Sequence, residues 1–250
     1  MSRIEDIHNK AIFIYDLEFI GDIKQLHTCK IWDMAFLCVE TGERFCTVVD
    51  PDPNLDQIPP PAVDGLFPLT RKFLSAHNAM PFYIVWQRAI QWIMKRSQDR
   101  HVILASHNNF SSDKTVLEHH ITFSPIELFF FDTLVFFRDA LTTYDYSLKG
   151  LVRLFLNRSH DNAHRAETDT KRLYECILTF NKPLCGYVYP LHYNSLRVIK
   201  GIGASVEDNL MRHGIYHEEQ LLNNYFVLYG LKLKKTHLDL IEQSIRLRLN

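Results

Sequence analysis

The stretch Ile12-Phe-Ile-Tyr-Asp-Leu-Glu-Phe-Ile20 is the part of this sequence from which the fold is most readily inferred. Its β-branched and aromatic residues, followed by Gly21, predict a strand. Two acids interrupt it, Asp16 and Glu18. Because side chains alternate between the two faces of a strand, these carboxylates are expected on the same face. Burying them is unfavourable without compensating positive charge, and the alternative is a strand with one polar, solvated face.

Apolar periodicity and turn residues locate the neighbouring elements. A Pro-rich loop spans Pro51 to Pro68. The pattern predicts strands at 31–39, 44–49, 102–105 and 128–132, and helices at 82–95, 113–121, 148–156 and 166–180. Strands followed by alternating strands and helices indicate an α/β fold, with a mixed β-sheet flanked by helices.

The alternation of strands and helices stops near residue 181. The segment 181–194 contains two prolines and a glycine and is the predicted linker. Beyond it, residues 195–250 show only short helical stretches. We therefore expect a first domain at 1–180 and a small all-α domain at 195–250.

The composition excludes several classes of protein. With 46% hydrophobic and 23% charged residues, the chain is neither disordered nor fibrous. Its 28 basic and 29 acidic residues give a formal net charge of −1, which argues against binding nucleic acid by bulk phosphate neutralisation. The five cysteines are scattered, which argues against a disulfide framework or a zinc site.

The ends and apolar runs of the chain indicate its compartment. The N-terminus has no apolar leader, and no apolar run approaches the ~20 residues of a membrane span. We therefore expect an intracellular protein, in the cytoplasm or nucleus, that is neither secreted nor bound to a membrane.

Two further polar groups accompany the acids of the first strand. Asp113 opens a predicted helix on its inward face, where it would also complement the helix dipole. His164 and Asp169 are five residues apart, about 140° around a helix. We therefore place His164 on the loop that enters the helix and Asp169 on its core-facing stripe, and a purely structural His–Asp pair is the alternative.

Four inward-facing acids and one loop histidine together predict metal-assisted hydrolysis. Carboxylate ligands without a cysteine or histidine cluster suit Mg²⁺ or Mn²⁺. Two such ions about 3.5–4 Å apart clamp the attacking and leaving oxygens of a phosphodiester displacement. A histidine with an ordinary pKa of about 6.5 can take the proton of the attacking water at neutral pH.

The order and spacing of these residues resemble the DnaQ-like, DEDDh-type 3′–5′ exonucleases of the ribonuclease-H-like superfamily. The matching motifs are Asp16-x-Glu18, His107-Asn108 leading to Asp113, and His164-x-Ala166-x-x-Asp169. A histidine five residues before the last aspartate, rather than a tyrosine four before it, indicates the DEDDh branch. The resemblance covers residues 10–180 and implies a ribonuclease-H-like sheet in an exonuclease domain.

The resemblance also implies a role for each site residue. Asp16 would bridge two divalent ions, Glu18 and Asp169 would complete the first ion's site, and Asp113 would hold the second. His164 would be the general base. The candidates for contact with the substrate are Leu17, Phe19, His107 and Asn108. Leu17 and Phe19 could equally belong to the core.

Residues 195–222 resemble a helix-hairpin-helix segment. Gly201-Ile-Gly203 lies between two short helical stretches, and such a glycine turn brings backbone N–H groups close to a phosphate. The candidate contacts with a nucleic-acid backbone are Lys200, Gly201, Gly203 and Arg212. A small packing domain or a protein-docking surface is the alternative.

These resemblances imply a metal-dependent 3′–5′ exonuclease that releases nucleoside monophosphates from single-stranded or frayed DNA 3′ ends. The helix-hairpin-helix resemblance favours DNA over RNA, and a polymerase or a repair or replication protein is a candidate partner. The alternatives are an exoribonuclease with the same two-metal chemistry and a non-catalytic adaptor that binds nucleic acid. The oligomeric state is left open.

Overall fold

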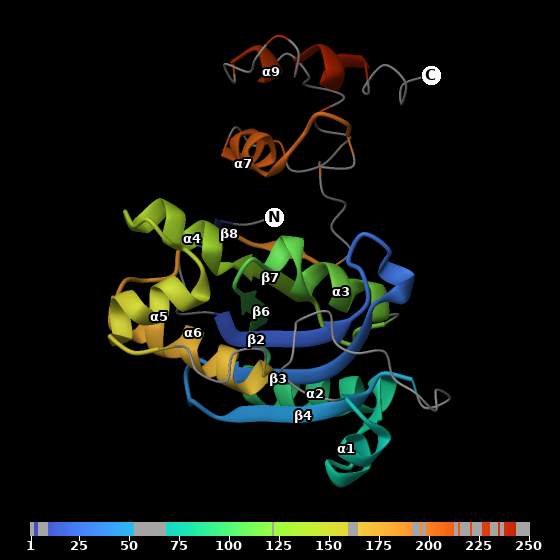
Figure 1. Ribbon diagram of the computed structural model, residues 1–250. Helices are drawn as coiled ribbons and strands as arrows, with labels where there is room; N and C mark the ends of the chain where they lie inside the picture. The colour runs from blue at the N-terminus through green and yellow to red at the C-terminus, as the bar shows by residue number, and fades with distance from the viewer. Residues whose placement is uncertain are drawn as a thin grey trace. The chain divides into compact units, whose positions relative to one another are not determined.

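The computed structural model in Figure 1 describes residues 3–4, 10–52, 69–121, 123–159, 165–191, 196, 199–212, 215, 221, 227–230, 235 and 238–243. The chain divides into two compact units, a larger one at Ser2–Leu191 and a smaller one at His192–Asn250 that also takes in Met1. Within the described ranges, no helix has the length and apolar character needed to cross a membrane.

A seven-stranded mixed sheet forms the centre of the larger unit, with the order β5-β4-β3-β2-β6-β7-β9. Its strands, in that order, are Met80–Pro81, Arg44–Asp50, Lys30–Cys38, Lys10–Ile20, His101–Ser106, Leu128–Asp132 and Tyr189–Pro190. Strand β2 is antiparallel to β3 but parallel to β6, which is parallel to β7. The carboxyl ends of β2, β6 and β7 therefore lie at the same edge of the sheet.

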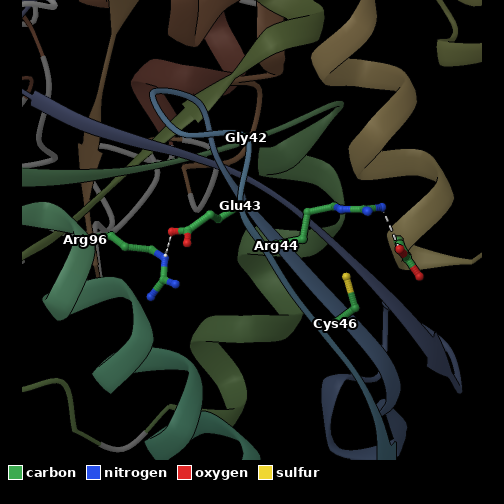
Figure 2. Close-up of a pocket in the computed structure, with 6 residues that line it drawn as sticks. Gly42, Glu43, Arg44, Cys46 and Arg96 are labelled. Carbon is green, nitrogen blue, oxygen red and sulfur yellow. Dashed lines mark hydrogen bonds and ion pairs between the residues drawn. The ribbon is translucent and has the colours of Figure 1, made fainter.

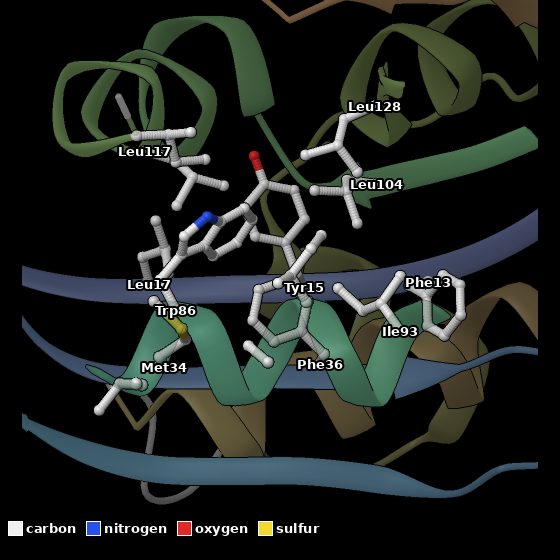
Figure 3. Close-up of a cluster of buried hydrophobic side chains, with 14 of the residues drawn as sticks. Phe13, Tyr15, Leu17, Met34, Phe36, Trp86, Ile93, Leu104, Leu117 and Leu128 are labelled. Atoms are coloured by element: carbon white, nitrogen blue, oxygen red, sulfur yellow. The ribbon is translucent and has the colours of Figure 1, made fainter. Parts of the chain in front are cut away.

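Helices cover both faces of this sheet (Figure 1). They are α1 (Arg71–Ala76), α2 (Phe82–Ser97), α3 (Asp113–His120), α4 (Thr133–Ala140), α5 (Leu148–Leu156) and α6 (Ala166–Phe180), with short 3₁₀ turns η2 (Leu26–Thr28) and η3 (Asn109–Ser111). Phe13, Tyr15 and Leu17 of β2 pack with α2 and α3, as Figure 3 shows for part of the cluster. Ile12 and Ile14 point to the opposite face, toward α4, α5 and α6. This alternation is the one predicted from the sequence.

The predicted α/β class, with a mixed sheet flanked by helices, is confirmed. Every predicted strand and helix of residues 11–180 is present, with ends that shift by a few residues. The sequence pattern missed α1, α4 and several two-residue strands. Helix α4 begins directly after β7, where Asp132 accepts a hydrogen bond from the backbone N–H of Leu134 at 2.9 Å, so no loop residues mark its start.

The segment 181–194, predicted as a linker, contains two short strands. Strand β8 (Gly186–Tyr187) pairs with β1 (Arg3–Ile4), and β9 pairs with β7 at the edge of the central sheet. An edge position suits Pro190, which lacks a backbone N–H. This part of the segment therefore belongs to the larger unit, and the assignment of 1–180 and 195–250 as separate functional domains stays a prediction.

The described residues of the smaller unit include the helices α7 (Ala204–Arg212) and α9 (Val227–Gly230), and none of these described residues lies in a strand. They share an apolar cluster that includes Leu196, Ile199, Ile202, Leu210 and Ile241. Gly201 has φ +96°, and a Cβ at this position would lie 2.9 Å from Cγ1 of Ile241. Both the positive φ and the close approach require glycine here.

Candidate metal centre

Three of the predicted acids come together where β2 meets the first turn of α6. Asp16 and Glu18 lie on one face of β2, and Asp169 lies in the first turn of α6. One carboxylate oxygen from each of the three residues lies within 4.8 Å of those of the others. Asp16 and Glu18, two residues apart on a strand, therefore lie on one face as predicted. The fold brings Asp169, which lies about 150 residues later in the sequence, next to them.

Asp113, the fourth predicted acid, is the first residue of α3 and is only 3% exposed. Its Oδ1 accepts a hydrogen bond from the backbone N–H of Leu17 at 3.1 Å, and its Oδ2 accepts one from the Ser106 hydroxyl at 2.5 Å. The pairing of β2 with β6 ends at Ile14 and Ala105, so the backbone of Leu17 lies beyond that ladder. Asp113 is thus bonded to the strand between Asp16 and Glu18.

Burial, and next the neighbouring charges or hydrogen bonds, shift the pKa values of Asp16, Glu18 and Asp113. Burial, and next the negative charges of Asp113 and Asp169, hold the pKa of Asp16 well above its usual range. Burial and the charge of Asp169 raise the pKa of Glu18 to about 8. Burial raises the pKa of Asp113 to about 7, although the hydrogen bonds from Ser106 and Leu17 oppose this shift. Buried carboxylates at such short range are compatible with ionisation when cations offset their charge, so the donor set fits hard divalent ions.

His164, the predicted general base, lies outside the described residues. The described chain resumes at Arg165, whose carbonyl accepts hydrogen bonds from the backbone N–H groups of Thr168 at 2.8 Å and Asp169 at 3.1 Å. Ala166 and Thr170 are buried on the inner side of α6, in accord with the predicted core-facing stripe. The position of Asp169 is therefore tied to the residue that follows the predicted base.

Asp33 and Arg165 are site neighbours that the sequence interpretation missed. Asp33 lies opposite Glu18 in the pairing of β2 with β3 and is 3% exposed. Arg165 Nε donates to Asp33 Oδ2 at 2.7 Å. An acid within the apolar strand 31–39 is a visible signal, but nothing in the local pattern connects it to an arginine 132 residues away.

Two of the predicted substrate contacts, His107 and Asn108, are bonded to protein groups. The ring nitrogens of His107 lie 3.1 Å from Thr133 Oγ1 and 2.7 Å from the Tyr146 carbonyl oxygen. Burial lowers the pKa of His107 to about 4, so the ring is neutral at physiological pH. The Asn108 backbone N–H donates to Asp132 Oδ1 at 3.1 Å. Both residues hold the loop between β6 and α3, and their contact with a substrate stays a prediction.

The other two predicted substrate contacts flank Glu18 on β2. Leu17 is 4% exposed and belongs to the apolar cluster of α2 and α3. Phe19 is partly buried against the same cluster. These placements fit the core role that the sequence left open, and a contact with the substrate stays a prediction for both.

A buried polar network fixes the loop that delivers Asp113. Asn109 Oδ1 accepts hydrogen bonds from the Tyr15 hydroxyl at 2.5 Å and from the Lys114 backbone N–H at 3.1 Å. Its Nδ2 donates to the Phe131 carbonyl at 2.8 Å. Asp132 also accepts from the Phe110 backbone N–H at 3.2 Å. The loop is therefore tied to β2, β7 and α3, which limits the positions that Asp113 can take.

A separate cavity of about 530 Å³ lies beside the turn that joins β3 to β4 (Figure 2). Its lining contains two ion pairs, Arg44 with Glu167 at 2.7 Å and Arg96 with Glu43 at 2.6 Å. The exposed Cys46 also lines this cavity. None of the four acids lines this cavity, and we assign no reaction to it.

The predicted backbone contacts of the smaller unit lie around the start and end of α7. Lys200 is exposed, Gly201 forms a turn, and Gly203 immediately precedes α7, with its carbonyl accepting from the backbone N–H groups of Val206 and Glu207 at 3.0 Å. Arg212 is the last residue of α7, and its side chain is outside the described part. Most of the stretch 192–198 is outside it too, so the helix-hairpin-helix motif stays a prediction.

We found no family model that matches this sequence, and no curated protein matches it. Among solved structures, it is similar to a 3′-exonuclease described for 3′-end specific recognition of the histone mRNA stem-loop, with 15% identity over 76% of this chain and 73% of that one and a TM-score of 0.53. The chain has a ribonuclease-H-like fold.

A second similar structure is that of cell-death related nuclease 4. Its identity is 12% and its TM-score is 0.44, over 68% of this chain and 64% of that one. This chain therefore matches less than two thirds of that nuclease. At 15% identity the similarity to the 3′-exonuclease shows the fold, whereas an activity depends on the residues at the site.

Proposed function

We propose that this protein is a metal-dependent 3′–5′ exonuclease that hydrolyses phosphodiester bonds at nucleic-acid 3′ ends and releases nucleoside monophosphates. The observation that carries the proposal is the meeting of Asp16, Glu18 and Asp169 within 4.8 Å. The bond from Leu17 that holds Asp113 against the same strand adds the fourth acid. The motif order in the sequence and the similarity to a 3′-exonuclease support the same activity.

The donor set suits two Mg²⁺ or Mn²⁺ ions, because all four side chains offer carboxylate oxygens. Asp16, Glu18 and Asp169 would hold one ion, and Asp16 with Asp113 would hold the other. Bound ions would supply Lewis-acid activation of water and charge stabilisation at the leaving oxygen.

The protein's own residues would accept the proton of the attacking water and orient the metal-binding carboxylates. His164, which directly precedes Arg165, would accept the proton of the attacking water at a ring nitrogen. Both oxygens of Asp113 accept hydrogen bonds from protein donors, so its carboxylate is oriented in advance. His107 stays neutral and serves the loop rather than proton transfer.

We infer DNA 3′ ends as the substrate from the helix-hairpin-helix resemblance at Gly201 and Gly203, with Lys200 and Arg212 beside the phosphates. A polymerase or a repair protein is then the expected partner. RNA is the second candidate, because the similar 3′-exonuclease is described as recognising the histone mRNA stem-loop.

A panel of end-labelled substrates tests this proposal: single- and double-stranded DNA and RNA, each with Mg²⁺ or Mn²⁺. We expect shortening from the 3′ end, fastest on single-stranded DNA. His164→Ala should lower the rate strongly with Mn²⁺ binding retained, while His27→Ala, at an exposed histidine, should leave the rate unchanged. Binding to 3′ ends without any product would support the adaptor and contradict the exonuclease.

A further inference from the structure

An ion pair between buried Asp33 and partly exposed Arg165 joins β3 to the start of α6. Arg165 Nε donates to Asp33 Oδ2 at 2.7 Å, and the same oxygen accepts the backbone N–H of Ala166 at 3.3 Å. The Asp33 side chain is 4% exposed and that of Arg165 is 26% exposed. One carboxylate therefore holds both the side chain before the helix and the first N–H within it.

Asp33 performs the capping that α6 lacks locally. The residue at the N-cap is Arg165, and its side chain makes no capping hydrogen bond to the helix. The first N–H groups of a helix have no partner inside it, and a carboxylate near them is favourable. Asp33 supplies this partner from a strand 133 residues before Ala166.

The ion pair of Asp33 and Arg165 lies next to the candidate metal ligands. Asp33 is the cross-strand neighbour of Glu18, and Arg165 immediately follows the predicted base, His164. The Arg165 carbonyl also accepts the backbone N–H of Asp169 at 3.1 Å. A continuous series of bonds thus runs from the strand beside Glu18 to the carboxylate-bearing turn of α6.

The remainder of α6 does not need this ion pair to stay on the sheet. Its inner face buries Thr170, Leu173, Cys176 and Ile177, and the last three of these pack in the cluster shared with α4 and α5. An apolar pair would join strand and helix without the desolvation cost of the buried Asp33 carboxylate. The ion pair is therefore better explained by the precision it gives to the first turn.

We propose that Asp33 and Arg165 are positioning residues that fix Asp169 relative to Asp16 and Glu18. This inference rests on the proposed function. It assigns to two residues outside the metal-ligand set a role in metal affinity and in the rate of hydrolysis, without contact with the substrate.

Five variants test the inference: Arg165→Ala, Arg165→Lys, Asp33→Asn, the double variant of Arg165→Ala with Asp33→Asn, and the control Arg44→Ala. The control removes an exposed ion pair between β4 and the same first turn of α6, Arg44 with Glu167 at 2.7 Å. Each variant is compared with wild type for Mn²⁺ affinity by calorimetry, for kcat and KM on a labelled strand, and for thermal unfolding.

We expect Arg165→Ala and Asp33→Asn each to weaken Mn²⁺ binding and lower kcat by about tenfold, as loss of groups that orient metal ligands does, with KM nearly unchanged. The double variant should add little to either single one, because both remove the same interaction. Millimolar guanidinium chloride should partly restore Arg165→Ala, and Arg165→Lys should retain part of the activity. Arg44→Ala should match wild type.

The inference is overturned if Arg165→Ala matches Arg44→Ala in metal affinity and kcat, or if its loss follows unfolding and neither guanidinium nor lysine restores it. A wild-type protein that binds Mn²⁺ but hydrolyses nothing would contradict the proposed function alone, and the Mn²⁺ affinities of the variants would still decide the ion pair's role. A wild-type protein that neither binds Mn²⁺ nor hydrolyses nucleic acid would overturn both the proposed function and the role of the ion pair.

Discussion

Asp113 and Leu17 are joined across 96 residues of sequence by a hydrogen bond of 3.1 Å from the Leu17 backbone N–H to Asp113 Oδ1. Leu17 lies between Asp16 and Glu18, so this bond ties the fourth acid to the strand that carries the first two. The Ser106 hydroxyl holds the other oxygen. The carboxylate therefore has a set orientation before any ion binds.

Removing the Ser106 hydroxyl should loosen this carboxylate. We expect Ser106→Ala to weaken Mn²⁺ binding about tenfold, because outer hydrogen-bond partners of ligands contribute that much. Calorimetric titration with Mn²⁺ measures the effect. Ser147→Ala is the matched control, since Ser147 caps α5 and its loss should cost about 1 kcal/mol of stability with no change in Mn²⁺ affinity. Equal Mn²⁺ affinities in Ser106→Ala and wild type would refute the role of this hydroxyl.

The metal-free protein should lose stability as pH rises. The pKa of Glu18 is raised from 4.5 to about 8, so the folded state favours the protonated form. The stabilisation of the fold by this proton is fully present below pH 4.5 and is lost as the pH rises to 8. In EDTA, the free energy of unfolding of Glu18→Gln should therefore exceed that of wild type by an amount that grows between pH 5 and 8.5. Denaturant unfolding at several pH values measures this gain. Parallel profiles of the two proteins would contradict the shift, and Mg²⁺ should restore wild-type stability at high pH.

Asp16→Asn should stabilise the metal-free fold while it removes the activity. The pKa of Asp16 is raised chiefly by burial and then by the charges of Asp113 and Asp169, so a neutral amide relieves an unfavourable cluster. We expect a higher midpoint of thermal unfolding in EDTA at pH 8, and no hydrolysis with Mn²⁺. Glu40→Gln, at an exposed acid, should change neither property. A lower midpoint for Asp16→Asn would show that the carboxylate stabilises the fold.

In the network around Asn109, the side-chain amide of Asn109 should contribute more to the stability of the fold than the Tyr15 hydroxyl does. Tyr15→Phe removes one of two bonds to Asn109 Oδ1 and should cost about 1 kcal/mol. Asn109→Ala leaves the Tyr15 hydroxyl and the Phe131 carbonyl without this partner and should cost about 3 kcal/mol. Denaturant unfolding compares the two variants, and equal losses would contradict this assignment.

The sequence predicted the parts of the site that follow from local periodicity. Alternation along β2 placed Asp16 and Glu18 on one face, and the 3.6-residue period of α3 placed Asp113 inward. Both rules act within one element, and each needs only neighbouring residues. The meeting of Asp169 with the strand acids was inferred from the motif order rather than from any local pattern.

The remaining features depend on contacts between distant elements. Arg165 has the sequence context of an ordinary residue before a helix, and its partner Asp33 lies on β3, 132 residues earlier in the chain. His107 reads as a candidate contact with substrate, yet Thr133 and the Tyr146 carbonyl flank both of its ring nitrogens. Helix α4 follows β7 without a loop, so no turn signal separates them.

The direction and product of hydrolysis test the central claim most directly. A 5′-labelled single strand is incubated with Mn²⁺ and wild type, Asp169→Asn or Glu167→Gln, whose exposed side chain lies on the same turn of α6. We predict a ladder that shortens from the 3′ end and free nucleoside monophosphates with wild type and Glu167→Gln, and an intact strand with Asp169→Asn or EDTA. An intact strand with wild type, or equal hydrolysis by Asp169→Asn, would contradict the account.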